Sequence, residues 1–433
     1  MNVLPHRLRA RLRSLRLLVP LRRRDYALLT AGSTVSLLGD GFFGVALAWQ
    51  VYEISNIPTA LSIVGAAWTA PLVAFILLGG VFSDRYDRRW MMIGADAVRA
   101  LAIGLLGLLS VSGVLELWHV IALIAFVGLG DAFFNPASSA IVPTLLPDEE
   151  LPQANALMGF IRPMMIRLVG PALGGFVVAV AGAGSAFLID GGTFVVSAAC
   201  IAAIATRPAV TATSHGLRQT VTEMGEGFAF VRRNPWCWAT LVAAMFSLLL
   251  FIGPVQVLLP FVVKNQLSLG AESLGFIYAA GGIGSVISAL LIGQLGIPRL
   301  KITVMYAAWS GGVLLLTGYG LMNALWQALL ISFVWQALFQ VGGIIWVTLL
   351  QTLVPRRLLG RVTSLDWLMS AGLVPVSFAL TGPVAAAVGV SETMIWGGLV
   401  GAFCMGILLF VPGVRDPERQ PAAMAPGGSE ATG

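Results

Sequence analysis

A few ionisable side chains lie inside long apolar stretches of this sequence, and they are the residues best placed to do chemistry. Asp40, Asp131 and Asp190 lie in such stretches, and so do Arg162 and Arg167. Charged groups are costly in hydrocarbon, so they are usually paired or face a water-filled pathway. A carboxyl group in that setting can hold a proton while it is shielded and release it when water arrives. These five residues are therefore candidates for moving protons or for binding a charged compound.

The composition sets the elements that must position these residues. Of the 433 residues, 58% are hydrophobic and only 11% are charged, against about 25% in a soluble domain. This excludes a soluble enzyme, a disordered scaffold and a secreted disulfide module. Twelve segments reach the roughly 20 apolar residues that a membrane-spanning helix needs. We therefore expect an all-α polytopic membrane protein with twelve transmembrane helices, at residues 26–51, 59–82, 90–113, 118–146, 150–181, 184–206, 236–263, 272–297, 300–322, 324–353, 361–388 and 392–413.

Basic residues indicate which ends of these segments face the cytoplasm, because cytoplasmic loops are enriched in Arg and Lys. One set of ends carries the Arg-rich stretch 7–24 and the basic loops that follow every second span. The opposite loops contain no Arg or Lys, and only Lys264 borders one. Both termini are thus predicted to be cytoplasmic. The abundance of Arg, Ala, Gly and Pro, which have GC-rich codons, indicates a bacterial source, so we expect the bacterial inner membrane.

The chain divides into five parts and contains an internal repeat. The stretch 144–147 (Thr-Leu-Leu-Pro) recurs as 352–355 (Thr-Leu-Val-Pro). Six spans separate the copies, so two six-helix halves run in parallel directions. Between the halves, apolar residues spaced three and four apart predict an amphipathic helix. The parts are a basic cytoplasmic arm (1–25), an N-terminal half (26–206), a linker (207–235), a C-terminal half (236–413) and a disordered cytoplasmic tail (414–433).

The loop after the second span reads Gly-Val-Phe-Ser-Asp-Arg-Tyr-Asp-Arg-Arg over residues 80–89. A Gly, an Asp four residues later and closing basic residues match the signature loop of the major facilitator superfamily. With twelve spans and parallel halves, the chain resembles that superfamily from about residue 26 to residue 414. Within it, the chain looks like the drug and siderophore exporter branch that includes the enterobactin exporter and macrolide efflux pumps. The segments 38–41, 132–137 and 167–175 carry this finer likeness.

The resemblance implies a gating role for that loop. Asp84 is expected to approach the start of the eleventh span, since a carboxylate near a helix N-terminus is stabilising by up to about 1 kcal/mol. This contact would latch the cytoplasmic side shut; the alternative is a tether that only sets topology. Asp96 and Arg99, three residues apart at the cytoplasmic start of the third span, are expected to pair and support the latch. The gate residues are Gly80, Asp84, Arg85, Arg88, Arg89, Asp96 and Arg99.

The fifth span contains Gly170, Pro171, Gly174 and Gly175, which resemble the glycine–proline motif of the superfamily's antiporters. The match is partial, because Ile166 stands where the motif usually has Gly. The motif implies exchange of a substrate for a proton. Small residues also let helices pack closely, so ordinary packing is the alternative interpretation.

The depths of the charged residues suggest partners for them. Asp131 in the fourth span is level with Arg162 and Arg167 in the fifth, at about 1.5 Å per residue. Taking consecutive spans as antiparallel neighbours, we predict that Asp131 pairs with Arg162 or Arg167. The superfamily's usual fourth-span Arg is absent, with Ile124 in its place. Asp40, near mid-membrane and with no basic residue close in sequence, is therefore the predicted proton carrier.

Further polar side chains lie in the sixth, seventh and tenth spans. Asp190 lies six residues into the sixth span from the outside, so we expect it to cap a helix or to pair near the surface. Gln336 and Gln340 are four residues apart and share a helix face, and Gln256 is expected to be buried in the seventh span. Amides beside aromatic rings suit a bulky, partly apolar ligand. Hydrogen bonding between helices is an equally good interpretation.

Motifs for enzymatic chemistry are absent from the sequence. There is no Gly-x-x-x-x-Gly-Lys-Ser/Thr phosphate loop, so ATP is not the direct energy source, and there is no Gly-x-Ser-x-Gly elbow. The histidines His6, His119 and His215 are scattered, and the three cysteines have no metal-ligand spacing. We therefore expect no enzyme activity, no cofactor and no metal.

These observations predict a secondary transporter that exports a hydrophobic or amphipathic small molecule by alternating access, in exchange for protons. The substrate would be a drug, a siderophore or a secondary metabolite. A lipid or lysophospholipid transporter of the same fold is the alternative. An intramembrane enzyme would need a clustered catalytic site, and a scaffold would need neither Asp84 nor Asp40. We expect a monomer whose partners are its substrate, protons and membrane lipids, with no nucleic acid.

Overall fold

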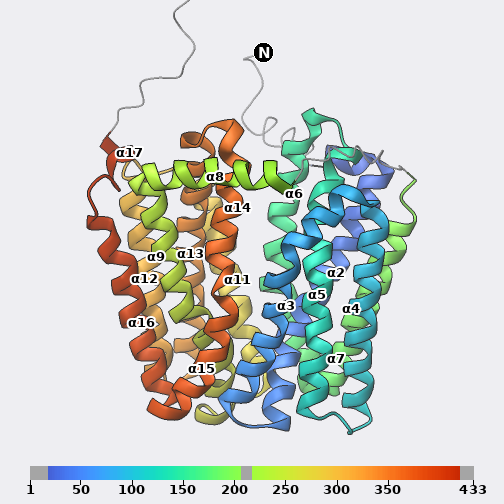
Figure 1. The fold of residues 1–433 in the computed structure, drawn as a ribbon. Coiled ribbons are helices and arrows are strands. Elements are labelled where there is room, and N and C mark those ends of the chain that lie inside the picture. The colour runs from blue at the N-terminus through green and yellow to red at the C-terminus, as the bar shows by residue number, and fades with distance from the viewer. Residues whose placement is uncertain (1–17, 206–216, 420–433) are drawn as a thin grey trace, which may run out of the picture.

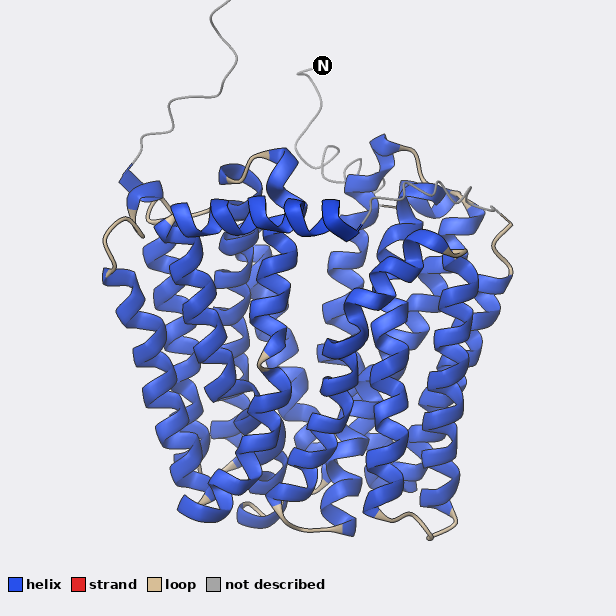
Figure 2. Cartoon of the chain, in the orientation of Figure 1, coloured by secondary structure: helices blue, strands red, loops and turns tan. Residues whose placement is uncertain are grey.

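The computed structural model describes residues 18–205 and 217–419, with the side chains of Asp84, Arg356 and residues 217–224 left undescribed. Most of the predicted basic arm, the first part of the linker and most of the predicted tail therefore lie outside the described residues. Helices make up nearly all of the described chain, and the described residues contain no strand (Figure 2). The prediction of an all-α polytopic membrane protein is confirmed.

The N-terminal half consists of long helices that follow the predicted spans closely. It begins with η1 (Val19–Arg22) and is then built, in chain order, from α2 (Arg24–Ile54), α3 (Pro58–Arg85), α4 (Arg88–Val111), α5 (Leu117–Leu145), η2 (Asp148–Glu150), α6 (Leu151–Pro163), the π-helical segment η3 (Met164–Val169) and α7 (Gly170–Ala202).

The C-terminal half follows the linker helix α8 (Leu217–Arg233), which lies across the ends of the spans (Figure 1). Its first span is interrupted by two π-helical segments, η4 and η5. The elements are α9 (Pro235–Gly253), η4 (Pro254–Leu258), α10 (Leu259–Phe261), η5 (Val262–Gln266), α11 (Ala271–Leu295), α12 (Lys301–Leu321), α13 (Leu325–Leu353), α14 (Arg356–Gly372), α15 (Val374–Val388), α16 (Val390–Ile407), η6 (Leu408–Phe410) and α17 (Asp416–Arg419).

Eleven helical segments among the described residues are long and apolar enough to cross a membrane, and one of them, Asp148–Ala202, contains two passes. Gly170 and Asp190 both pack against the same short piece of α2, around Gly39 and Gly41. Twenty residues of straight helix would separate them by about 30 Å, so the chain must reverse between them. It does so at Gly182, whose φ of +79° is open to glycine without strain. Twelve passes result, as predicted.

The two halves stand side by side and are closest at the end opposite α8 (Figure 1). Glycines permit this approach: a Cβ on Gly175 of α7 would lie 2.7 Å from Ala271 O of α11, and one on Gly382 of α15 would overlap Thr59 of α3. Polar contacts close the same end, since Tyr52 Oη donates to Val257 O at 2.6 Å and Asn56 bonds Asn265 at 2.6 Å.

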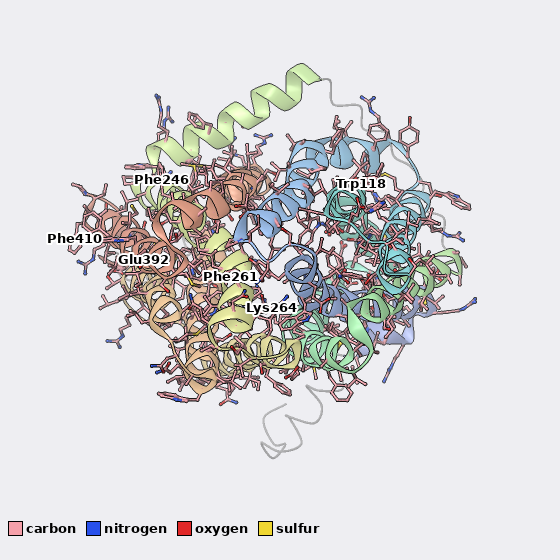
Figure 3. All side chains as sticks on the ribbon, turned by 90° about the horizontal axis from the view of Figure 1, so that it is seen from below. Trp118, Phe246, Phe261, Lys264, Glu392 and Phe410 are labelled. Atoms are coloured by element: carbon pink, nitrogen blue, oxygen red, sulfur yellow. The ribbon has the colours of Figure 1, made fainter. Side chains whose placement is uncertain are left out.

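Lys264 explains why a single basic residue borders the outer loops. Its Nζ donates to Tyr52 O in the last turn of α2 at 2.6 Å, and it lies 5.5 Å from the ring centre of Trp49. A cation is stabilising at a helix C-terminus. Figure 3, seen from the end opposite α8, shows Lys264 and Phe261 at the centre of the molecule, where the two halves meet.

The halves diverge toward α8, the end that the basic residues assign to the cytoplasm (Figure 1). Between α3 and α14, a groove of about 230 Å³ is lined by Leu72, Ile76, Thr363, Trp367 and Ala371 among others. The arrangement is thus closed on the predicted outer side and open on the predicted cytoplasmic side.

Candidate proton and substrate site

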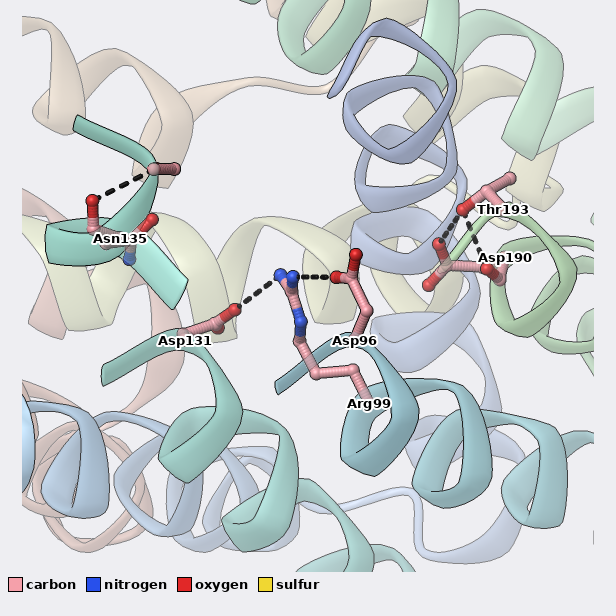
Figure 4. Close-up of polar contacts among 7 residues, drawn as sticks. Asp96, Arg99, Asp131, Asn135, Asp190 and Thr193 are labelled. Atoms are coloured by element: carbon pink, nitrogen blue, oxygen red, sulfur yellow. Dashed lines mark hydrogen bonds and ion pairs between the residues drawn. The ribbon is translucent and has the colours of Figure 1, made fainter. Parts of the chain in front are cut away.

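A cluster of buried charges lies within the N-terminal half, centred on Arg99 of α4 (Figure 4). Arg99 is only 3% exposed. Its Nη1 donates to Asp131 Oδ1 at 3.0 Å, and its Nη2 donates to Asp96. The rings of Phe134 and Phe194 cover the guanidinium, with their centroids 4.2 and 4.4 Å from Cζ. Arg99 is therefore held by two carboxylates and by cation–π contacts.

The predicted pairing of Asp131 with Arg162 or Arg167 is wrong. Asp131 accepts from Arg99 and, on its other oxygen, from Trp68 Nε1 of α3 at 3.0 Å. The prediction assumed that consecutive spans are neighbours. In the structure α5 packs against α3 and α4, whereas the fifth span, η3 and the start of α7, packs against α2. Equal depth in the membrane was therefore not enough to bring these side chains together.

The Asp96–Arg99 pair is present, as predicted from the spacing of three residues. Its setting differs from the prediction, because Asp96 is 0% exposed and belongs to the buried cluster rather than to the cytoplasmic loop. A glycine makes room for the pair, since a Cβ on Gly130 of α5 would lie 2.7 Å from Arg99 Cγ.

The expectation that Asp190 caps or pairs near the surface is also wrong. Asp190 is 0% exposed and packs against Gly39, on which a Cβ would overlap Asp190 Oδ1. Thr193 Oγ1 lies 3.3 Å from Oδ1 but also donates to the Asp190 carbonyl oxygen at 2.7 Å. Oδ2 has no hydrogen-bond partner among the described residues. A buried carboxylate without a cation is costly, so the neutral, protonated form suits this position.

Asp40 is partly exposed and makes no hydrogen bond or ion pair within the described part of the chain. It is nevertheless close enough to Arg99, Arg162 and Asp131 for their charges to interact, and its charge also acts on Asp190. The preceding residue, Gly39, is the glycine against which Asp190 packs. Asp40 therefore lies at the partly exposed edge of the buried cluster.

The cluster holds more acid than base. Four carboxyl groups share one fully buried guanidinium, and Arg162 is the next cation within electrostatic range; the carboxyls are those of Asp40, Asp96, Asp131 and Asp190. Asp96 and Asp131 already use both Nη atoms of Arg99. The carboxyl groups in excess are therefore those of Asp40 and Asp190. Because uncompensated negative charge is unfavourable here, this pair is suited to hold an exchangeable proton.

The C-terminal half faces this cluster with amides and aromatic rings. Arg167 of η3 reaches across and donates from Nη1 to Gln336 Oε1 of α13 at 3.1 Å. Gln340, one turn further along α13, is partly exposed. The prediction that Gln256 is buried is wrong: its side chain is exposed, whereas Val255 and Val257 beside it are buried, as expected when one face of a helix turns away from the core.

The sequence as a whole was compared with known proteins and families. The family model described as "Transmembrane secretion effector" matches residues 16–426. The chain belongs to this family of major facilitator superfamily transporters. The family is one of transporters and not of enzymes.

Relatives of this transporter include exporters. The enterobactin exporter EntS of Escherichia coli O1:K1 / APEC is 28% identical over 343 residues, covering 76% of this chain and 78% of the exporter. An uncharacterized MFS-type transporter of Bacillus subtilis strain 168, YfiS, is 26% identical over 354 residues, covering 79% and 83% of the two chains. These matches extend over most of both proteins.

Solved structures share the fold of this transporter at low sequence identity. A bacterial homolog to the human lysosomal transporter Spinster, in an inward-facing and unoccupied conformation, aligns with a TM-score of 0.70 at 12% identity, covering 93% of this chain and 99% of that chain. The nucleoside transporter NupG aligns with a TM-score of 0.68 at 11% identity, covering 89% and 99%. These likenesses show the major facilitator fold alone.

The signature loop of the transporter is tied to its own half by two arginines. Arg88 Nη1 donates to Ala140 O of α5 at 3.0 Å, and Arg89 Nε donates to Ile201 O of α7 at 3.0 Å. Asp87 caps α4 by accepting from the Arg89 backbone N–H. Arg85 is exposed, and the side chain of Asp84 lies outside the described residues. The latch stays a prediction, as does its alternative, a tether.

The glycine–proline motif lies at helix contacts. A Cβ on Gly170 would lie 2.7 Å from Gly41 Cα, one on Gly174 would lie 2.6 Å from Phe42 Cα, and Gly275 of α11 packs against Pro171 O. Gly175 adds the contact with α11 described above. This geometry is the close packing that was the alternative interpretation, and it leaves a role in antiport untested.

Sequence reasoning missed the neutral residues that shape the site. Trp68, Phe134 and Phe194 contact Arg99 or Asp131. Gly130 makes room for Arg99, and Gly39 makes room for Asp190. One signal was available, because Gly39 and Gly130 each lie directly beside a deep Asp. Their role depends on the facing helix, which the sequence does not display.

Proposed function

We propose that this transporter exports a hydrophobic or amphipathic small molecule, such as a drug, a siderophore or a secondary metabolite, by alternating access. Export is driven by protons that enter in exchange. The observation that carries the proposal is the surplus of carboxyl groups at Asp40, which is partly exposed, and at Asp190, which is buried against Gly39. The similarity to EntS supports the direction of transport.

In this mechanism a proton and the substrate occupy the site in alternation. When the outer side opens, a proton neutralises the Asp40–Asp190 pair, and the neutral cluster can then be shielded from water. When the cytoplasmic side opens, water reaches Asp40, the proton leaves toward the cytoplasm, and substrate enters the space between the halves. The protein acts as a monomer in the bacterial cytoplasmic membrane, with its termini in the cytoplasm and its spans surrounded by lipid.

The test uses purified protein in proteoliposomes and a panel of fluorescent cationic, neutral and anionic compounds, preselected by accumulation in a pump-deficient bacterial host. Asp40→Asn and Asp190→Asn mimic the protonated form. We expect both variants to lose uphill export driven by a pH gradient while still exchanging substrate down its own gradient. Uphill, pH-driven export by the double variant would refute proton coupling through this pair.

A second candidate is movement of a lipid or lysophospholipid. The groove between α3 and α14 favours it, because Leu77 and Trp367 on its walls are 62% and 60% exposed and offer a surface for an acyl chain. Transfer of a fluorescent lysophospholipid between leaflets of the same proteoliposomes separates the two functions. Transfer of the lipid with no export of any soluble compound would favour this candidate.

A further inference from the structure

The fifth span changes its helical geometry where its two arginines lie. Met164–Val169 forms the π-helical segment η3, and the Gly170 N–H bonds to Met165 O, five residues back. Such segments are rare and occur frequently at functional sites. Arg167 lies within η3. Arg162 is five residues before Arg167 and lies just ahead of η3.

This segment determines how the two guanidinium groups are placed. In an α-helix, residues five apart point about 140° away from each other. A π-helical turn holds more residues than an α-helical turn, so it changes the relative directions of side chains on its two sides. In the structure Arg162 is close enough to Arg167 for their charges to interact. Two like charges therefore lie near each other beside a π-helical turn.

Neither of these guanidinium groups is held by a carboxylate among the residues that the structure describes. Arg167 donates to the neutral amide of Gln336. Arg162 makes no hydrogen bond or ion pair with a described residue, and its side chain is exposed. Asp40 is within electrostatic range of Arg162, but it is shared with Arg99. Arg99, by contrast, has two carboxylates and two aromatic rings around it.

The depth of Arg162 shows what it faces. It lies eleven residues beyond Leu151, the start of α6, which is about 16 Å along the helix and near mid-membrane. A charged group at that depth is costly if it faces lipid. Its electrostatic contacts with Asp40 and Arg167, and the reach of Arg167 to α13, place it at the space between the halves.

We propose that Arg162 and Arg167 form an anion-binding site between the two halves, and that the exported compound is an amphipathic anion. Two guanidinium groups would hold its carboxylate, phenolate, sulfonate or phosphate. Gln336 and Gln340 supply neutral polar contacts opposite. The rings of Trp335 and Phe339 on α13 pack against Phe251 and each other, and the part of each ring that stays exposed offers apolar surface to the body of the compound. This inference rests on the proposed export function and names the substrate class of the same site.

The experiment compares two fluorescent probes that share the same dansyl group. Dansylglycine carries a carboxylate, and dansylglycinamide replaces it with a neutral amide. Binding is measured by fluorescence on the purified full-length protein in nanodiscs, after subtraction of empty nanodiscs. We expect the carboxylate probe to bind about tenfold to a hundredfold tighter, since a hydrogen bond to a charged group contributes roughly 1.5–3 kcal/mol.

Variants of Arg162 and Arg167 test whether these two residues cause the preference for the carboxylate probe. Arg162→Gln/Arg167→Gln should bind both probes equally, whereas Arg162→Lys/Arg167→Lys should keep part of the preference because the charge remains. Arg299→Gln, which removes an exposed arginine from the cytoplasmic loop before α12, is the matched control and should behave as wild type. If the glutamine variant does not fold, the wild-type probe comparison and the lysine variant still decide the matter.

Two results would overturn the inference: equal or weaker binding of the carboxylate probe by wild type, or an undiminished preference in the folded glutamine variant. An anionic lipid headgroup presents the same chemistry as a soluble anion. Displacement of the probe by lysophosphatidylglycerol but not by 2,3-dihydroxybenzoate would identify the lipid source, and the reverse would identify a soluble compound. Export of cations alone would leave the proposed function standing without this site, whereas a binding preference without any export would do the opposite.

Discussion

Among single residues, Arg99 is the one whose replacement we expect to be strongly destabilising. Its two Nη atoms are divided between Asp96 and Asp131, and it is enclosed by Phe134 and Phe194. Removing one partner of a buried ion pair leaves charge without compensation, which costs more than the pair itself contributes. Arg99 is therefore a structural centre of the N-terminal half, whereas Asp40 and Asp190 are the pair that we propose to exchange a proton.

Arg99→Met should lower the free energy of unfolding by about 3–5 kcal/mol, because two carboxylates lose their cation. Reversible unfolding by SDS in mixed micelles would measure this. Arg299→Met, on the exposed loop, should stay within about 0.5 kcal/mol of wild type. The triple variant Arg99→Met/Asp96→Asn/Asp131→Asn should recover part of the loss. An equal loss in the triple variant would mean that packing, and not unpaired charge, sets the cost.

At the scale of elements, glycines decide which helices approach each other. Gly39 of α2 accepts Asp190 and Thr193 of α7, Gly130 of α5 accepts Arg99 of α4, and Gly175 brings α7 to α11 of the other half. Without a strong hydrophobic force between helices in lipid, such close packing is the main source of specificity. The buried cluster exists because these contacts hold four helices in register.

Gly39→Ala should destabilise the protein by about 1–3 kcal/mol, the usual cost of overpacking, and should impair pH-driven export. Its Cβ would overlap Asp190 Oδ1 and Thr193 Oγ1. Gly44→Ala is the matched control on the same helix, since a Cβ there meets nothing within 4 Å. It should be neutral, or stabilising by up to about 1 kcal/mol through helix propensity. Similar effects of the two substitutions would contradict the packing role of Gly39.

For the whole molecule, the structure corresponds to one end of the proposed alternating-access cycle, closed on the predicted outer side. The outer side is closed by Asn56 with Asn265, by Tyr52 with Val257 and by Lys264 with the end of α2. The halves diverge on the other side (Figure 1). Transport would require these outer contacts to break and the cytoplasmic ends to meet.

A cross-link across the outer contact should stop transport. In a background where Cys200, Cys237 and Cys404 are replaced, Asn56→Cys/Asn265→Cys places two thiols where the amides now bond at 2.6 and 3.1 Å. Oxidation should reduce export to background, and a reducing agent should restore it. Either single cysteine variant should be insensitive to oxidation. Full export by the oxidised double variant would show that the outer side need not open.

The predicted latch at Asp84 also concerns the whole molecule, because it would join the cytoplasmic ends of the two halves. Asp84→Asn should weaken the cytoplasmic latch and shift the population toward the inward-open state. Labelling of cytoplasmic-side cysteines in membranes should then become faster. Asp87→Asn, which weakens only the cap of α4, is the control. Unchanged labelling together with full transport would favour the tether over the latch.

The sequence by itself determined the spans and the resemblance to the superfamily, and it predicted their direction. Whether a segment enters the bilayer depends on the summed transfer free energy of its own residues, and direction depends on the charge of its own flanks. For that reason the break near Gly182 and the pair of Asp96 and Arg99, three residues apart, could be predicted from neighbouring residues in the sequence. The family's signature loop is likewise a continuous motif.

Only the tertiary structure decided the partners of the deep charges. Asp131 bonds Arg99 and Trp68 because α5 packs between α3 and α4, and not beside the span that follows it in sequence. Asp190 is buried because Gly39, some 150 positions earlier, has no side chain. Arg167 reaches Gln336 of the other half from within a π-helical turn. Contacts between distant segments and a local change of helix type leave no periodic trace in the sequence, which is why spacing alone assigned these residues the wrong partners.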